Sequence, residues 1–297
     1  MKSKVYFTRE ISPEKVVEMY EKLGVELKGN VAVKLHSGEK GNTNFLRPDF
    51  WKPMIEKLDG TVVECNTAYG DAFDGVRDHT KPHWELMEYH GWTKNFKVDI
   101  MDEEGPDVEW EVENGKQLKS NLVGKNILNY DSMLVLAHFK GHPMGGYGGA
   151  LKQLSIGCAS SAGKALIHSA GASDDNIDCW QKHADLDGFP EAMADAASTV
   201  VKHFDGQIAF VNVMKNLSVD CDCVSTPEPP CMKDIGILVS LDPVAIDKAC
   251  MDLIYAATDD PGQAHFLERV HSRHGEHTIE AAEALGFGTT DYELIEV

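Results

Sequence analysis

Three clusters of residues in this 297-residue chain combine side chains that could transfer protons, bind anions or hold a metal. The first is Lys34-Leu35-His36-Ser37-Gly38-Glu39, which follows a short β-branched run. Lys34 and His36 are two residues apart, so on an extended chain their side chains face the same side. A lysine, an imidazole and a carboxylate at a strand end can move protons, so Lys34, His36 and Glu39 are candidate catalytic residues. The alternative interpretation is an ordinary charged loop.

The second cluster is a glycine-rich stretch that contains two histidines. It follows the apolar run 133–137. His138 and His142 are four residues apart and suggest a metal pair, although Phe139 stands where a zincin has its glutamate. Glycines ahead of an expected helix could present backbone N–H groups to an anion. The candidate anion contacts are Gly146, Gly148, Gly149, Lys140 and Lys152, with Lys164 and His168 further along the chain.

The third cluster is Asp220-Cys221-Asp222-Cys223. On an extended chain a C-x-C segment places both sulfurs on one side. Thiolates bind zinc, copper(I) and iron–sulfur clusters, so Cys221 and Cys223 are candidate ligands of zinc or iron, with Cys231 as a third ligand left open. The alternative is that these cysteines are small buried hydrophobic residues.

An alternation of strand and helix patterns has to position these clusters. Short β-branched or continuously apolar runs predict strands over 5–8, 31–35, 61–65, 133–137, 208–214 and 235–240. Helical periodicity and end signals predict helices over 13–23, 48–58, 81–90, 190–204, 243–257, 264–274 and 278–285. The alternation is typical of an α/β fold with a mostly parallel central sheet flanked by helices. Residues 97–120 interrupt it and predict an antiparallel excursion at a sheet edge. We expect one unit over 1–297, or two closely packed lobes of about 1–130 and 131–297.

The charge balance excludes some partners. Lys and Arg number 28 against 48 Asp and Glu, a net charge of −20, which argues against nucleic acid and anionic membranes. The acidic surplus is uneven, because His138 to His168 contains three lysines and no acidic residue. A locally basic pocket on an acidic body favours a small anionic ligand.

The N-terminal residues and the cysteines bear on location. No apolar run reaches the roughly 18 residues of a membrane helix, and residues 1–12 do not resemble a secretory signal. Seven is an odd number of cysteines, so one must stay unpaired within the chain, and the expectation is a cytoplasmic protein with reduced thiols.

The sequence resembles the uncharacterised iron–sulfur-centre protein family, domain of unknown function 362. The matching segments are Lys34–Glu39 with Gly41-Asn42, Asn66–Gly70 with His83, His138–His142, Gly148–Lys152, Gly163-Lys164 with His168, Asp220–Cys223, and Asp234–Leu238 running into Asp242–Asp247. The resemblance implies no established activity. Many members carry an inserted ferredoxin-like module with C-x-x-C-x-x-C runs, but residues 172–192 of this chain hold only Cys179. A four-iron four-sulfur cluster usually needs four cysteines and is therefore not expected here.

The leading hypothesis is a metal-dependent or redox-linked α/β protein that acts on or binds a small anion, whether or not it is an enzyme. If electrons are needed, a separate electron-transfer protein would deliver them. The alternative is a non-catalytic carrier or binding module for a metal or a nucleotide. A third interpretation is that these lysines and histidines are ordinary surface and loop residues. A site would instead require Lys34, His142, Lys152 and Cys221 to line one cleft, and a search for a reaction product would separate an enzyme from a carrier. The sequence does not indicate the oligomeric state.

Overall fold

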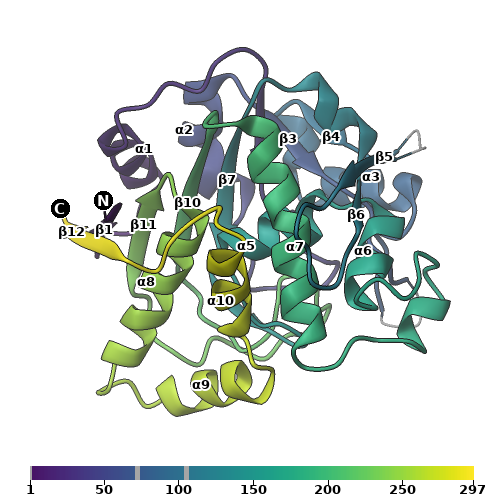
Figure 1. The fold of residues 1–297 in the computed structure, drawn as a ribbon. Coiled ribbons are helices and arrows are strands. Elements are labelled where there is room, and N and C mark those ends of the chain that lie inside the picture. Colours follow the sequence, from purple (N-terminus) through teal and green to yellow (C-terminus); the bar gives the residue numbers. More distant parts are fainter. Residues whose placement is uncertain (1, 71–73, 104–106) are drawn as a thin grey trace.

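The computed structural model of this protein describes residues 2–70, 74–103 and 107–297. Its centre is an eight-stranded sheet with helices on both faces (Figure 1). In spatial order the strands are β12 (Tyr292–Glu296), β1 (Ser3–Thr8), β11 (Gly236–Ser240), β10 (Ile208–Met214), β7 (Ser132–His138), β2 (Val31–Lys34), β3 (Thr61–Glu64) and β4 (Val98–Ile100). All neighbours are parallel except the two pairs that involve β11. The predicted α/β class with a mostly parallel sheet is confirmed.

The helices form layers on the two faces of this sheet. They are α1 (Pro13–Lys22), α2 (Pro48–Leu58), α3 (Thr80–Tyr89), α4 (Trp92–Asn95), α5 (Ala150–Cys158), α6 (Ser161–His168), α7 (Gly188–Phe204), α8 (Pro243–Ala256), α9 (Gln263–Ser272) and α10 (His277–Ala284). Strand β7 is buried along its whole length, as its apolar run predicts. Met133 and Val135 pack with α5, α7 and α8, whereas Leu134 and Leu136 pack with α1 and α2. The described residues contain no helix with the length and apolarity to cross a bilayer.

Helix boundaries follow the local signals read from the sequence. The Ser12 hydroxyl accepts a hydrogen bond from the Lys15 backbone N–H, and Pro13 is the first residue of α1. Asp242 caps α8 in the same way, and its carboxylate accepts from two backbone N–H groups.

The predicted antiparallel excursion near 97–120 is present, but it forms a separate two-stranded sheet and not the edge of the central sheet. Strands β5 (Val108–Glu111) and β6 (Ser120–Val123) pair antiparallel in a sheet of their own. Trp110 stacks on His203 of α7, so the apolar positions of β5 pack on a helix. The edge of the central sheet is instead β4, which is parallel to β3.

The order of strands places a topological switch point between β2 and β7. From β2 the chain proceeds to β3 on one side, and from β7 it proceeds to β10 on the other. In open α/β sheets such a point opens a crevice at the carboxyl ends of the strands. Lys34 and His138 end these two strands.

Strand β1 of the first predicted lobe lies between β12 and β11 of the second, while the division into one unit or two stays a prediction.

Candidate metal centre and anion cavity

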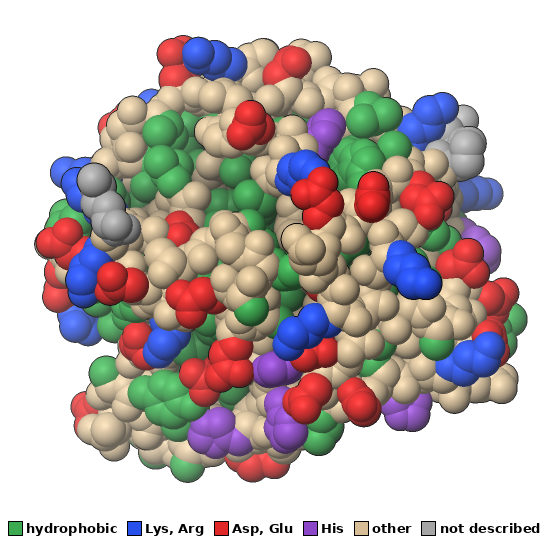
Figure 2. All heavy atoms as spheres, viewed as in Figure 1, with side chains coloured by type: hydrophobic (Ala, Val, Ile, Leu, Met, Phe, Trp, Pro, Cys, Tyr) green, Lys and Arg blue, Asp and Glu red, His purple; other side chains and the backbone are tan. Residues whose placement is uncertain are grey.

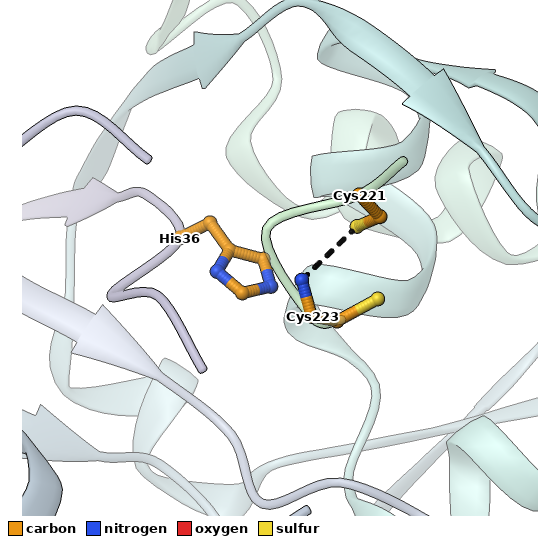
Figure 3. Close-up of side chains that lie close together, drawn as sticks. All are labelled: His36, Cys221 and Cys223. Atoms are coloured by element: carbon orange, nitrogen blue, oxygen red, sulfur yellow. Dashed lines mark hydrogen bonds between the residues drawn. The ribbon is translucent and has the colours of Figure 1, made fainter. Parts of the chain in front are cut away.

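Two cysteines and a histidine meet at this crevice. Ligand atoms of His36, Cys221 and Cys223 all lie within 4.8 Å of one another. His36 follows β2, and the cysteines lie on the loop between β10 and β11. Figure 3 shows the Nε2 edge of the imidazole facing the two cysteines. Two sulfurs and one imidazole are a donor set that zinc and iron accept.

The environment of Cys221 favours its thiolate. The Lys152 ammonium and the Cys223 backbone N–H both lie 3.5 Å from Cys221 Sγ. Burial opposes ionisation, but a hydrogen bond between the Cys221 and Cys223 side chains and the charge of Lys152 hold the Cys221 pKa well below its usual range. The same hydrogen bond, together with burial, raises the Cys223 pKa. Because a thiolate is the form that binds metals, this electrostatic setting fits metal ligation.

The imidazole of His36 is neutral, as a metal ligand must be. Burial and the charge of Arg77 lower its pKa well below the usual value. Nδ1 accepts a hydrogen bond from the Gly38 N–H at 3.0 Å, so the ring proton is on Nε2. Ligation through Nε2 would therefore require the ring to lose this proton or the Gly38 peptide to turn away.

His138, a predicted metal ligand, lies outside this group. Its side chain pairs with the carboxylate of Asp222. Its Nδ1 lies 2.9 Å from the Asp222 carboxylate, and its Nε2 faces the Lys215 carbonyl. Lys140, a predicted anion contact, pairs with the same carboxylate at 3.0 Å. These charges outweigh the effect of burial and hold the Asp222 pKa well below its usual range. His138 and Lys140 therefore position the loop that carries the cysteines.

His142, the other predicted histidine ligand, contacts the site but is not one of the three grouped residues. Its Nδ1 accepts hydrogen bonds from the backbone N–H groups of Met144 and Gly145. The ring proton is therefore on Nε2. Burial lowers the His142 pKa, while its hydrogen bond with Cys221 acts in the opposite direction. The geometry makes His142 a hydrogen-bond donor to the Cys221 thiolate.

Cys231, the open third ligand, lies outside the group and donates to the Leu217 carbonyl.

A cavity of about 50 Å³ lies beside the cysteines, at the carboxyl ends of β2 and β3 and against α5 and α6. Its polar lining consists of Lys34, His36, Glu64, Thr67, Tyr69, Arg77, His142, Lys152, Gln153, Lys164, His168 and Cys223. A water needs roughly 10–15 Å³ of such volume, so the cavity suits a ligand of only a few heavy atoms. Lys34, His142 and Lys152 share one cavity, and Cys221 contacts Lys152 at its edge.

Two ion pairs occupy part of this lining. Lys34 Nζ lies 2.6 Å from Glu64, whose other oxygen accepts from the Ser37 N–H and hydroxyl. Burial opposes ionisation of Glu64, but the positive charge of Lys34 outweighs this effect. The pKa of Glu64 therefore lies well below the usual value. Arg77 pairs with Glu39 at 3.1 Å. The predicted catalytic Glu39 is therefore a buried partner of Arg77 and not a cavity-lining group.

Lys164, Gln153 and His168 present unused hydrogen-bonding capacity to the cavity. Lys164 Nζ donates to the Ala159 carbonyl and makes no ion pair among the described residues. Burial lowers the pKa of Lys164. Gln153 Nε2 is buried without any partner among the described residues. The Nδ1 of His168 donates to the Lys164 carbonyl, which leaves its Nε2 lone pair unprotonated.

The comparisons place the chain in a family. The model of the family "Domain of unknown function (DUF362)" matches residues 31–252. The chain belongs to this family. The matched region includes the carboxyl ends of β2, β3, β7 and β10 and therefore the whole candidate site of this DUF362 protein. The family match does not confirm the iron–sulfur association that the resemblance carries. Cys179 is buried and has no cysteine beside it in the 172–192 segment.

Two solved structures resemble the DUF362 chain distantly. The lactate racemase apoprotein from Thermoanaerobacterium thermosaccharolyticum is 12% identical with a TM-score of 0.43, over 70% of this chain and 50% of its own. A structural-genomics protein from Thermotoga maritima is 10% identical with a TM-score of 0.44, over 92% of this chain and 58% of its own. The chain thus spans half to three fifths of these proteins. No curated protein matches the sequence.

The glycine-rich stretch of the DUF362 protein has a local structure that bears on its predicted role as an anion site, and that role stays a prediction. It forms the hairpin of β8 (Lys140–His142) and β9 (Gly146–Gly148). The first N–H groups of α5, those of Ala150 and Leu151, donate to Asp247 of α8. A side chain at Gly149 would collide with that carboxylate, and one at Gly148 would press on Lys152. The helix N-terminus is therefore satisfied inside the protein, and the glycines allow close packing.

Asp247 makes the stability of the protein depend on pH. Burial raises its pKa to about 6, although Asn212 and the α5 backbone donate to it. The folded state then binds this proton more tightly than the unfolded chain, so its contribution to stability falls as pH rises from about 4 to 6. The loss is at most about 3 kcal/mol. Urea unfolding across this range should show that slope in the wild type and not in Asp247→Asn. A variant with the wild-type slope would contradict the assignment.

A group of histidines on α9, on α10 and between them lies at the surface of the DUF362 protein. Figure 2 shows histidines among acidic side chains on the face of the molecule that carries these helices. His274 pairs with Asp187, His277 with Glu191 and Glu280, and His271 contacts Tyr255. Because most of these partners are exposed, the histidines are explained as polar groups at a solvated helix end.

Sequence reasoning missed several residues of the site. Glu64 could have been found, because it lies one residue before the end of a predicted strand, as Lys34 does. Gln153 lies on a predicted helix but carries no sequence signal of its own. Arg77 and Tyr69 lie in the loop after β3, and only the fold shows that they reach the cavity.

Proposed function

We propose that this protein binds a transition-metal ion, zinc or iron, through Cys221, Cys223 and His36. The bound ion lies beside a cavity that admits a small anion. The observation that carries the proposal is the convergence of two thiols and an imidazole within 4.8 Å, from segments about 185 residues apart in sequence. Lys152 supports it, because its ammonium contacts both Cys221 and the cavity.

The metal would supply Lewis-acid or redox chemistry when bound. Lys152 balances thiolate charge, and His142 donates a hydrogen bond to the same sulfur. Asp222 fixes the loop between the two sulfurs through its pairs with His138 and Lys140. These roles keep the donor set in place before any ligand arrives.

The cavity walls offer proton-handling groups for an anionic ligand. The Lys34–Glu64 pair lines the cavity and can share a proton across 2.6 Å. The Nε2 of His168 can accept a hydrogen bond from a ligand, but burial lowers the His168 pKa to about 3, so it is a weak base at neutral pH. We propose Lys34 and His36 as the groups nearest the chemistry, with Glu39 acting through Arg77.

The cavity size weighs against the alternative of a nucleotide carrier. Sites for ligands of drug or nucleotide size measure about 300–1,000 Å³, whereas this cavity measures about 50 Å³. The remaining alternative is a protein that carries a metal ion and catalyses no reaction. A small-molecule product formed by the metal-loaded protein would distinguish the enzyme from this carrier.

Metal analysis of untagged protein tests the proposal. Wild type should retain zinc or iron in near-stoichiometric amount, and Cys221→Ser/Cys223→Ser should lose it, because two of three ligand atoms are replaced. Cys231→Ser is the matched control and should keep the metal, since this cysteine lies outside the group. Equal and negligible metal in wild type and double variant would overturn the proposal, provided that circular dichroism shows both folded.

A further inference from the structure

Some of the cationic side chains around the cavity form ion pairs with acidic side chains, and others do not. Lys34 pairs with Glu64, and Arg77 pairs with Glu39. Lys152 lies against the sulfur of Cys221. Lys164 is 6% exposed, lines the cavity and makes no ion pair among the described residues. A buried ammonium without a counter-ion is costly, so the Lys164 end of the cavity favours one negative charge.

The unused donors on these walls match one particular acceptor group. Lys164 Nζ has three hydrogens, of which one goes to the Ala159 carbonyl. Gln153 Nε2 is buried, unpartnered among the described residues and carries two more. The two remaining N–H groups of Lys164 and the two of Gln153 match in number the roughly four lone-pair sites of a carboxylate. The ligand must also be small, because the cavity measures about 50 Å³.

The groups that usually hold a phosphate or sulfate dianion are occupied elsewhere. The N-terminal N–H groups of α5 donate to Asp247. The guanidinium of Arg77 could bind a phosphate with two parallel N–H groups, but it is paired with Glu39. A dianion would therefore bring a second negative charge that lacks a free partner beside Lys164.

We propose that the ligand of this cavity is a small monocarboxylate whose carboxylate is held by Lys164 and Gln153. The proposal rests on the anion cavity of the proposed function and names the class of its ligand. Lys164 supplies the charge and Gln153 supplies the neutral donor. Neither residue belongs to the metal donor set, so the two parts of the site can be tested separately.

The test is a titration of [¹³C]acetate into the protein as purified, followed by NMR line broadening at constant ionic strength. Acetate should bind, unlabelled formate should compete, and sulfate should not. Lys164→Met should weaken acetate binding by about tenfold or more, and Gln153→Leu by roughly fivefold. Lys81→Met, at a lysine whose side chain is 88% exposed, should leave binding unchanged. Metal content is measured in every sample.

The outcomes separate this proposal from the metal centre. If acetate binds and only the Lys164 and Gln153 variants lose affinity while keeping their metal, the proposal stands. Sulfate competing as well as formate would overturn the monocarboxylate class and leave the anion cavity in place. Absence of binding by either anion, with metal retained, would overturn the anion site altogether. Should Lys164→Met fail to fold, Gln153→Leu decides, and wild-type affinity in that variant counts against the proposal.

Discussion

Replacing Asp222 by asparagine is expected to lower the free energy of unfolding by about 3–5 kcal/mol. Asp222 is 1% exposed and lies between His138 and Lys140, which are themselves buried. The substitution keeps the shape of the side chain but removes the negative charge, which leaves the buried ammonium of Lys140 without a counter-ion. Urea unfolding of metal-free protein measures the loss. Because Asp222 fixes the loop between Cys221 and Cys223, metal retention should fall as well.

The pH dependence of this effect has a definite sign. The pKa of Asp222 is lower in the folded protein than in the unfolded chain. Its stabilisation is therefore complete above about pH 4 and is lost as pH falls through the folded pKa. The difference between wild type and Asp222→Asn should shrink in acid. Glu113→Gln is the control, since its pair with Lys202 is exposed on both sides and should contribute at most about 1 kcal/mol. Equal effects of the two substitutions would contradict the account.

Glu64→Gln is expected to cost a similar amount, about 3–5 kcal/mol, through the other buried pair. Lys34 is fully buried, and without Glu64 its ammonium would face only the Leu35 carbonyl. Arg77 lies 3.8 Å from the same carboxylate and adds to the uncompensated charge. The amide also replaces the acceptor of the Ser37 N–H and hydroxyl with a weaker one. Chemical unfolding monitored by circular dichroism measures the loss.

A surface pair of the same length provides the control for Glu64. Lys57 and Glu21 also lie 2.6 Å apart, but their side chains are 35% and 57% exposed. Glu21→Gln should therefore change stability by less than about 1 kcal/mol. Similar losses for Glu21→Gln and Glu64→Gln would show that burial of the Lys34–Glu64 pair has no energetic consequence.

The strands and helices could be predicted from the sequence because their signals are local. The continuous apolar run of β7 and the Ser12-Pro13 start of α1 each depend on a few neighbouring residues. The antiparallel placement of β11 and the separate sheet of β5 and β6 could not be predicted in this way. Strand order depends on packing between segments that are far apart in the chain.

The candidate site was only partly predictable for the same reason. Cys221, Cys223 and His36 follow predicted strands, and the parallel sheet brings them together. The assignment of His138 as a ligand and of the glycines as an anion loop depended on unseen partners. Asp222 engages His138, and Asp247 engages the start of α5. Both are acidic residues buried more than 80 residues away in sequence, which spacing alone does not reveal.

X-ray absorption spectroscopy of the zinc-loaded wild-type protein tests the central claim most directly. The account predicts a first shell with two sulfur neighbours at about 2.3 Å and one nitrogen neighbour at about 2.0–2.1 Å. Cys221→Ser/Cys223→Ser should show no sulfur neighbours. A wild-type shell made only of nitrogen and oxygen would contradict a metal centre formed by Cys221, Cys223 and His36.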